Sequence, residues 1–167
     1  MTLLIAFAAA CGFHVALRSV HLWWMLGTCQ PLLLVMVAAT RRHTPTGVAW
    51  WGAAVGLASD LLAHRIVGPG AIAGALAGSL VAVVIRRFEL AGPLFWIVGS
   101  LAGAAVSEIA WLGVLLSLDA VPDHGWLGVL ATVATTAAAA AVVASGERAL
   151  AWWRSPQRAR RRVLKRL

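Results

Sequence analysis

The stretch Trp50–Gly78, WWGAAVGLASDLLAHRIVGPGAIAGALAG, contains two apolar segments joined by a short bend at Gly68-Pro69-Gly70. Glycine recurs every fourth residue in both segments. The spaced positions are Gly52, Gly56, Gly70, Gly74 and Gly78. A spacing of four places each set on one face of a helix. In lipid, such faces let two helix backbones approach closely. We expect these glycines to form a helix-packing groove that also accepts a partner helix.

The composition is that of an integral membrane protein. Of the 167 residues, 61% are hydrophobic and 12% are charged, and the mean hydropathy is +0.85. A membrane helix needs about 20 mainly apolar residues. The segments that meet this need lie at about 2–17, 22–39, 46–64, 69–85, 92–117 and 126–150. The sequence therefore predicts an all-α, polytopic membrane bundle of six transmembrane helices, with a transmembrane domain over 1–153 and a basic tail over 154–167.

Basic residues predict the orientation of this bundle. The net charge is +8, and arginine pairs occupy the second and fourth loops, whereas the odd-numbered loops hold only Arg18 and Arg65. By the positive-inside rule, both termini and the even-numbered loops are cytoplasmic. We expect a cytoplasmic basic surface that meets anionic lipids rather than nucleic acid. Its members are Arg41, Arg42, Arg86, Arg87, Arg158, Arg160, Arg161 and Arg162.

Two carboxylates, Asp60 and Glu108, lie within apolar segments, where a charge at a helix centre costs about 2.5 to 3.5 kcal/mol. At about 1.5 Å per residue, each acid lies about 21 to 24 Å from the inner face. We expect both in an intramembrane polar cluster near the outer surface, together with nearby cations. Those cations are Arg18, His64 and Arg65. Such a cluster is either a site for a partner or ligand, or an ion-pair network that fixes helix register.

No pattern of catalytic or metal-binding residues stands out. The histidines lack zinc-ligand spacing beside an acid. Ser59 and Ser107 each precede an acid directly, so serine and acid point to different helix faces. Cys11 and Cys29 lie within apolar runs and are typical of small buried hydrophobes. We expect a protein without enzyme activity and without a cofactor.

Several motifs between Pro31 and Glu108 occur together in one known family. They are the Pro31-Leu-Leu-Leu-Val helix start, the basic Arg41-Arg42-His43 loop, the glycine-spaced helix that ends at Asp60, the small-residue helix that closes with Arg86-Arg87, and Glu108 late in the fifth segment. In these features, and in its size and six segments, the chain resembles the bacterial rod shape-determining protein MreD family.

This resemblance implies a non-enzymatic, multi-pass scaffold of the bacterial cytoplasmic (inner) membrane. Family members are thought to bind MreC and, through it, the MreB filament, RodA and a class B penicillin-binding protein, which build peptidoglycan for cell elongation and rod shape. The family fold is similar to that of the substrate-binding subunits of energy-coupling-factor transporters. A subunit that binds a small solute near Asp60 and Glu108 is therefore an alternative. A membrane protein with no specific partner beyond lipid, and a homo-oligomer, also stay open.

Overall fold

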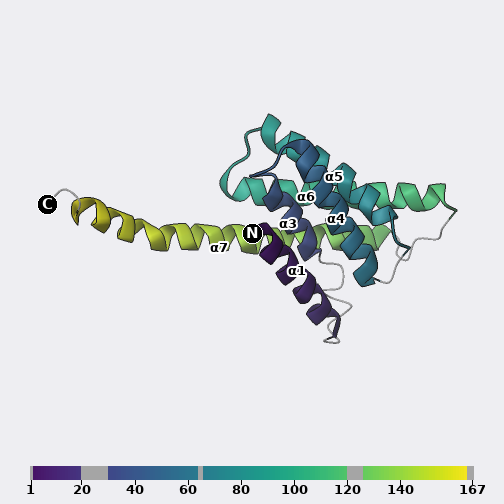
Figure 1. The fold of residues 1–167 in the computed structure, drawn as a ribbon, viewed down its shortest axis with the longest axis horizontal. Coiled ribbons are helices and arrows are strands. Elements are labelled where there is room, and N and C mark those ends of the chain that lie inside the picture. Colours follow the sequence, from purple (N-terminus) through teal and green to yellow (C-terminus); the bar gives the residue numbers. More distant parts are fainter. Residues whose placement is uncertain (1, 20–29, 64–65, 120–125, 165–167) are drawn as a thin grey trace.

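The structure, a computed structural model, describes residues 2–19, 30–63, 66–119 and 126–164, without the side chains of 14, 17–19 and 154–164. Over these ranges the chain is all-α and forms six helices (Figure 1). The helices are α1 (Thr2–Ser19), α3 (Pro31–Ala39), α4 (Pro45–Ala63), α5 (Pro69–Arg87), α6 (Gly92–Ser117) and α7 (Trp126–Leu164).

Proline marks the start of four of these helices. Pro31, Pro45 and Pro69 are the first residues of their helices, and Pro93 is the second residue of α6. Proline suits a first turn because its fixed φ is helical and its missing N–H would have no helical partner there. Ahead of α5, Gly68 has a φ of 126°, a backbone conformation that glycine adopts without steric cost.

The helix boundaries differ from the expected ones at two places. The helix expected over 22–39 begins only at Pro31, and residues 22–29 lie outside the described ranges. Gln30 has φ −104° and ψ 80°, because a proline ring disfavours helical backbone in the residue before it. The last helix, expected to end near residue 150, continues to Leu164. The remaining four expected segments agree with α1, α4, α5 and α6 within about two residues.

The short helix α3 forms the centre of the bundle. Its side chains Leu32, Met36 and Val37 are at most 2% exposed. Each of the other five described helices packs against it. The core around α3 is completed by residues such as Val81 of α5 and Trp96 of α6.

Three of the described helices are long and apolar enough to cross a membrane. They are α5, α6 and the Trp126–Trp153 part of α7. Only 33% of the apolar window of α6 and 28% of that of α7 is buried within the protein. Large apolar side chains therefore cover the outside of the bundle, which in water would promote association but suits contact with lipid. These helices indicate a multi-pass membrane protein.

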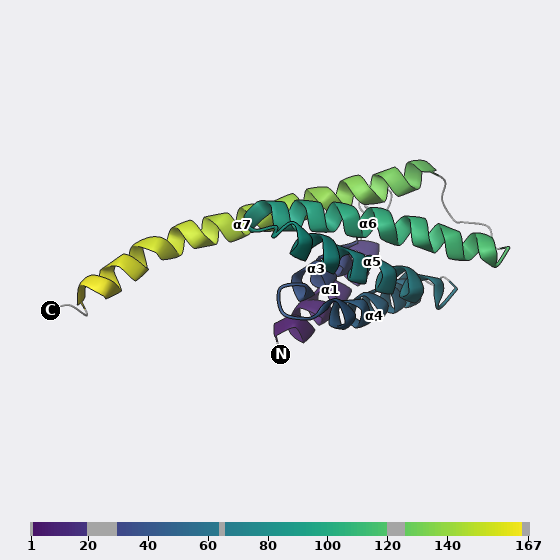
Figure 2. The same cartoon turned by 90° about the horizontal axis from the view of Figure 1, so that it is seen from above.

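Helix α7 is the longest element and extends well past the rest of the bundle. Figures 1 and 2 show it lying beside α6 and then continuing alone toward the C-terminus. Its candidate membrane span ends at Trp153. The boundary expected at 153/154 therefore lies within a continuous helix.

Candidate functional site

The five spaced glycines lie where α4 and α5 contact each other. A Cβ added to Gly56 would overlap the carbonyl oxygen of Gly70, and one added to Gly52 would overlap that of Gly74. A Cβ on Gly78 would lie 2.6 Å from the carbonyl oxygen of Val48. The two glycine faces thus pack backbone against backbone, and the groove expected to receive a partner helix is filled by the chain's own helices.

Asp60 follows Gly56 on the same face of α4, and its side chain caps the start of α5. Its side chain is 2% exposed, and its Oδ2 atom accepts hydrogen bonds from the backbone N–H groups of Gly68 at 3.0 Å and Gly70 at 2.9 Å. The first N–H groups of a helix have no partner within that helix. A negative group is also stabilised there by the helix dipole. Asp60 therefore joins the end of α4 to the start of α5.

Glu108 of α6 belongs to a chain of hydrogen bonds that links α6, the start of α3 and α7. It is 4% exposed, and its Oε1 atom accepts a hydrogen bond of 2.9 Å from the side-chain amide of Gln30. The backbone N–H of Gln30 in turn donates to the Thr136 hydroxyl of α7, at 3.3 Å. The residue that precedes α3 is thus bonded to both α6 and α7.

Asp60 and Glu108 line the same small cavity, whose volume is about 30 Å³. Gln30, Ser59 and Ser107 contribute further polar groups to its wall. A space of this size holds one or two water molecules. The two acids therefore face one shared space, whereas their depth in the bilayer stays a prediction.

The cations expected beside these acids lie outside the described part of the molecule. The side chain of Arg18 is not described, and neither are residues His64 and Arg65. Their place in the polar cluster stays a prediction.

A second polar cluster lies at the other end of the bundle and was missed by the sequence reasoning. Arg41, just after α3, makes a two-pronged ion pair with Glu147 of α7, with N–O distances of 2.8 and 3.0 Å. The indole N–H of Trp96 donates to the same carboxylate at 2.8 Å. The guanidinium carbon of Arg41 lies 4.2 Å from the ring centre of Phe95 and 5.0 Å from that of Trp96. We call these four residues the Arg41–Glu147 clamp.

The clamp fixes α7 to the start of α6. Its two charged side chains are 41% and 43% exposed, and an ion pair at such a surface contributes only about 0 to 1 kcal/mol. The flat aromatic rings beneath the guanidinium and the indole hydrogen bond restrict its geometry further. One signal was available in the sequence, because Glu147 is among only six acids in the chain and lies near the basic end of an apolar helix.

Comparison with family models, curated proteins and solved structures found no match for this chain.

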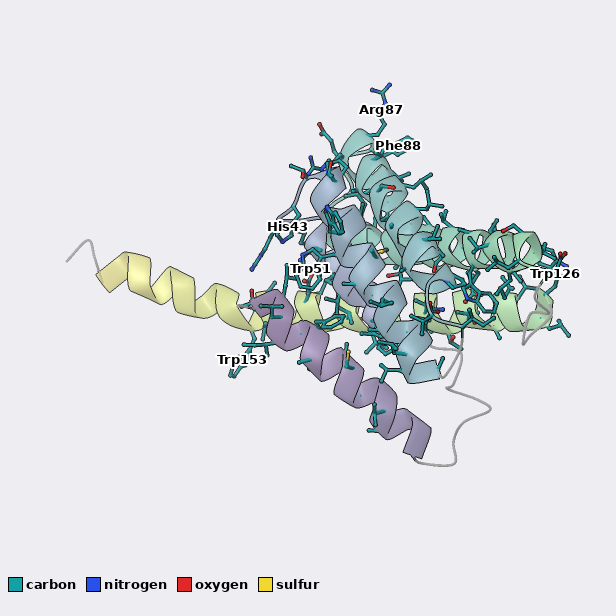
Figure 3. All side chains as sticks on the ribbon, turned by 45° about the vertical axis from the view of Figure 1, so that its right-hand side comes forward. His43, Trp51, Arg87, Phe88, Trp126 and Trp153 are labelled. Atoms are coloured by element: carbon teal, nitrogen blue, oxygen red, sulfur yellow. The ribbon has the colours of Figure 1, made fainter. Side chains whose placement is uncertain are left out.

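Arginines of the expected basic surface gather at the same end as the clamp. Arg42 donates to the Thr2 hydroxyl of α1 at 2.6 Å, and Arg86 donates to the carbonyl oxygen of His43 at 2.5 Å. Arg87 follows at the end of α5, next to Phe88 (Figure 3). Arg158, Arg160, Arg161 and Arg162 lie on the projecting part of α7, where the backbone alone is described.

The described polar groups therefore connect helices to one another. Asp60 connects α4 to α5, Glu108 connects α6 to the start of α3, and Glu147 connects α7 to the end of α3. Among the described residues, no group of three or more histidine, cysteine or acidic side chains has the geometry to hold a metal ion.

Proposed function

We propose that this chain is a membrane scaffold whose surfaces bind other proteins of the same membrane. The observation that supports the proposal is that the two buried acids bond neighbouring parts of the chain to each other. Asp60 accepts two backbone hydrogen bonds from the start of α5, and Glu108 is bonded to Gln30. Intramembrane carboxylates are costly and are retained for a purpose, and here that purpose is to hold neighbouring helices in register.

The proposed topology has six membrane spans with both termini in the cytoplasm. Three candidate spans support it. So does the gathering of Arg41, Arg42 and Arg86 at one end of the bundle, because arginine-rich ends face the cytoplasm. The candidate span of α7 also ends at that end, beside the clamp.

The proposed partners follow from the resemblance to MreD. They are MreC and, through it, the MreB filament, RodA and a class B penicillin-binding protein of the elongation machinery. Because the α4 and α5 glycine faces are filled within the chain, we place the partner surfaces elsewhere. The lipid-facing sides of α6 and α7 offer apolar surface for a membrane helix, and the projecting end of α7 offers a cytoplasmic extension.

Co-purification tests this proposal. The tagged chain is co-expressed with an MreC-type protein that has one membrane span, and both are extracted in mild detergent. We expect a stable complex for the full chain and for a chain that ends at Trp153. Only the full chain should also retain the filament protein. An unrelated single-span protein is the control, and equal recovery of both single-span proteins would contradict the proposal.

The small-solute alternative has less support. Sites for small molecules are usually cavities of about 300 to 1,000 Å³, whereas the space beside Asp60 and Glu108 measures about 30 Å³. A vitamin-sized ligand would have to separate α3 from its neighbours, although most of the side chains of α3 are buried. A rise in melting temperature on addition of a vitamin would favour this alternative over the scaffold.

A further inference from the structure

An open apolar groove runs between α5 and α6 on the outside of the bundle. Its volume is about 470 Å³. Leu76, Leu80 and Val83 line it from α5, and Val106 and Ile109 line it from α6. Unlike the glycine faces of α4 and α5, this groove is not filled by another described helix.

The polar atoms of the groove wall are already bonded. Ser79 lies in the wall, and its hydroxyl donates to the carbonyl oxygen of Leu76 at 2.9 Å. Such a bond within one helix satisfies the hydroxyl without a ligand. The groove therefore presents mainly carbon to its occupant.

Arg87 lies on the groove face of α5. Leu76, Leu80, Val83 and Arg87 follow one another at spacings of four, three and four residues, which places them on one helix face. The side chain of Arg87 is exposed, and within the described ranges no residue hydrogen-bonds to it. Its neighbour Arg86, by contrast, is bonded to His43. A cation with free donors therefore stands one turn beyond the groove, at the end of α5 (Figure 3).

The length of α5 from Leu76 in the groove to Arg87 matches one leaflet of a bilayer. Leu76 and Arg87 are eleven residues apart, or about 16 Å along the helix. One leaflet contributes about 15 Å of hydrocarbon, half of the total of about 30 Å. The groove together with Arg87 thus extends from the headgroup level to about the midplane.

We propose that this groove binds one anionic phospholipid of the leaflet at the arginine end. One acyl chain lies along Leu76, Leu80 and Val83, opposite Ile109. The phosphate accepts hydrogen bonds from the guanidinium of Arg87, whose planar fork suits phosphate oxygens. A protein partner on α7 leaves this site free, since the groove is formed by α5 and α6 alone.

Native mass spectrometry of the full chain tests the site. The detergent-solubilised protein is titrated with phosphatidylglycerol and with phosphatidylcholine that carries the same acyl chains. We expect the first phosphatidylglycerol to bind more tightly than phosphatidylcholine. Arg87→Gln should weaken that binding about fivefold, the effect of one cation at a membrane surface. Ala110 of α6 also lines the groove, and Ala110→Phe should weaken binding because the added ring fills the space.

Two matched variants serve as controls. Arg148→Gln removes an exposed arginine from α7, and Ala134→Phe adds a ring to an exposed position of α7. Both should bind phosphatidylglycerol as the unmodified chain does. Equal losses for Arg87→Gln and Arg148→Gln, or equal affinity of the two lipids, would overturn the site. So would a protein helix found in the groove. Arg87 is exposed, so its variant tests the site even where Ala110→Phe does not fold.

Discussion

The carboxylate of Asp60 accepts two backbone hydrogen bonds that would otherwise be missing at the start of α5. The capping carboxylate comes from the preceding helix because Gly68, the residue before α5, has no side chain with which to cap it. The arrangement also explains the nearby glycine, since a Cβ on Gly70 would overlap the Asp60 carboxylate. The Asp60 carboxylate thus contributes to the need for glycine at residue 70.

Asp60→Ala should destabilise the protein by about 1 to 3 kcal/mol, because it leaves buried N–H groups without an acceptor. Asp60→Asn keeps one acceptor oxygen and should cost less. Thermal unfolding in detergent measures both. Asp119→Asn is a suitable control, since Asp119 is exposed and asparagine tolerates its φ of 52°. Equal melting temperatures for Asp60→Ala and Asp119→Asn would contradict the capping role.

At the residue scale, sequence predicted which acids are buried but not what they bind. Asp60 and Glu108 are conspicuous because each is alone in an apolar run. Gln30 is not conspicuous, since its role depends on α3, α6 and α7 meeting at one point. Glu147 was missed for the same reason, because Arg41 and Trp96 are distant from it in sequence and come together only in the folded bundle.

Helices α4 and α5 pack closely because both lack side chains along the line of contact. Carbonyl oxygens of one helix occupy the space that Cβ atoms would need on the other. Close backbone approach increases dispersion contacts, which replace the hydrophobic effect as the attraction between helices in lipid. Each glycine is therefore needed at its position, although glycine weakens an isolated helix.

Gly56→Ala and Gly113→Ala should have opposite effects. The Cβ at residue 56 overlaps the backbone of α5, so the helices must separate, at a cost of about 1 to 3 kcal/mol. At Gly113 nothing lies within 4 Å of the added Cβ, and alanine should raise helix stability by up to about 1 kcal/mol. Melting temperatures of the two variants give the comparison. Equal losses would show that the α4–α5 contact is not specific.

The helix ranges were largely predictable because an apolar run of fixed length is a strong signal. Pro31 and α7 show where that signal fails. Hydropathy continues across Gln30, but α3 begins only at the proline that follows, because that proline disfavours helical backbone at Gln30. At the C-terminal end, hydropathy falls after Trp153 while the backbone stays helical, because arginine and alanine favour helices in water as well.

At the scale of the whole molecule, the two ends of the bundle differ in chemistry. One end holds the acids Asp60 and Glu108 around a small cavity. The other holds the Arg41–Glu147 clamp and the bonded side chains of Arg42 and Arg86. Because the two ends of the bundle carry different groups, the molecule has a preferred orientation in the bilayer.

Reporter fusions should reveal this direction. A phosphatase active only outside the cytoplasm should be inactive when fused after His43, after Glu89 or at the C-terminus. It should be active after Val67 or Asp119, which lie at the other end of the bundle. A fluorescent protein that folds only in the cytoplasm should give the reverse pattern. Phosphatase activity after Glu89 would contradict the proposed orientation.

The continuity of α7 has a mechanical consequence. Eleven residues follow Trp153 within the same helix, a rod of about 16 Å. Pro156 lies within this extension and lacks the N–H for one helical hydrogen bond, so the helix has a defined place at which to bend. A partner bound to this extension is joined through one helix to Glu147, which pairs with Arg41, and to Thr136, which accepts a hydrogen bond from Gln30 ahead of α3.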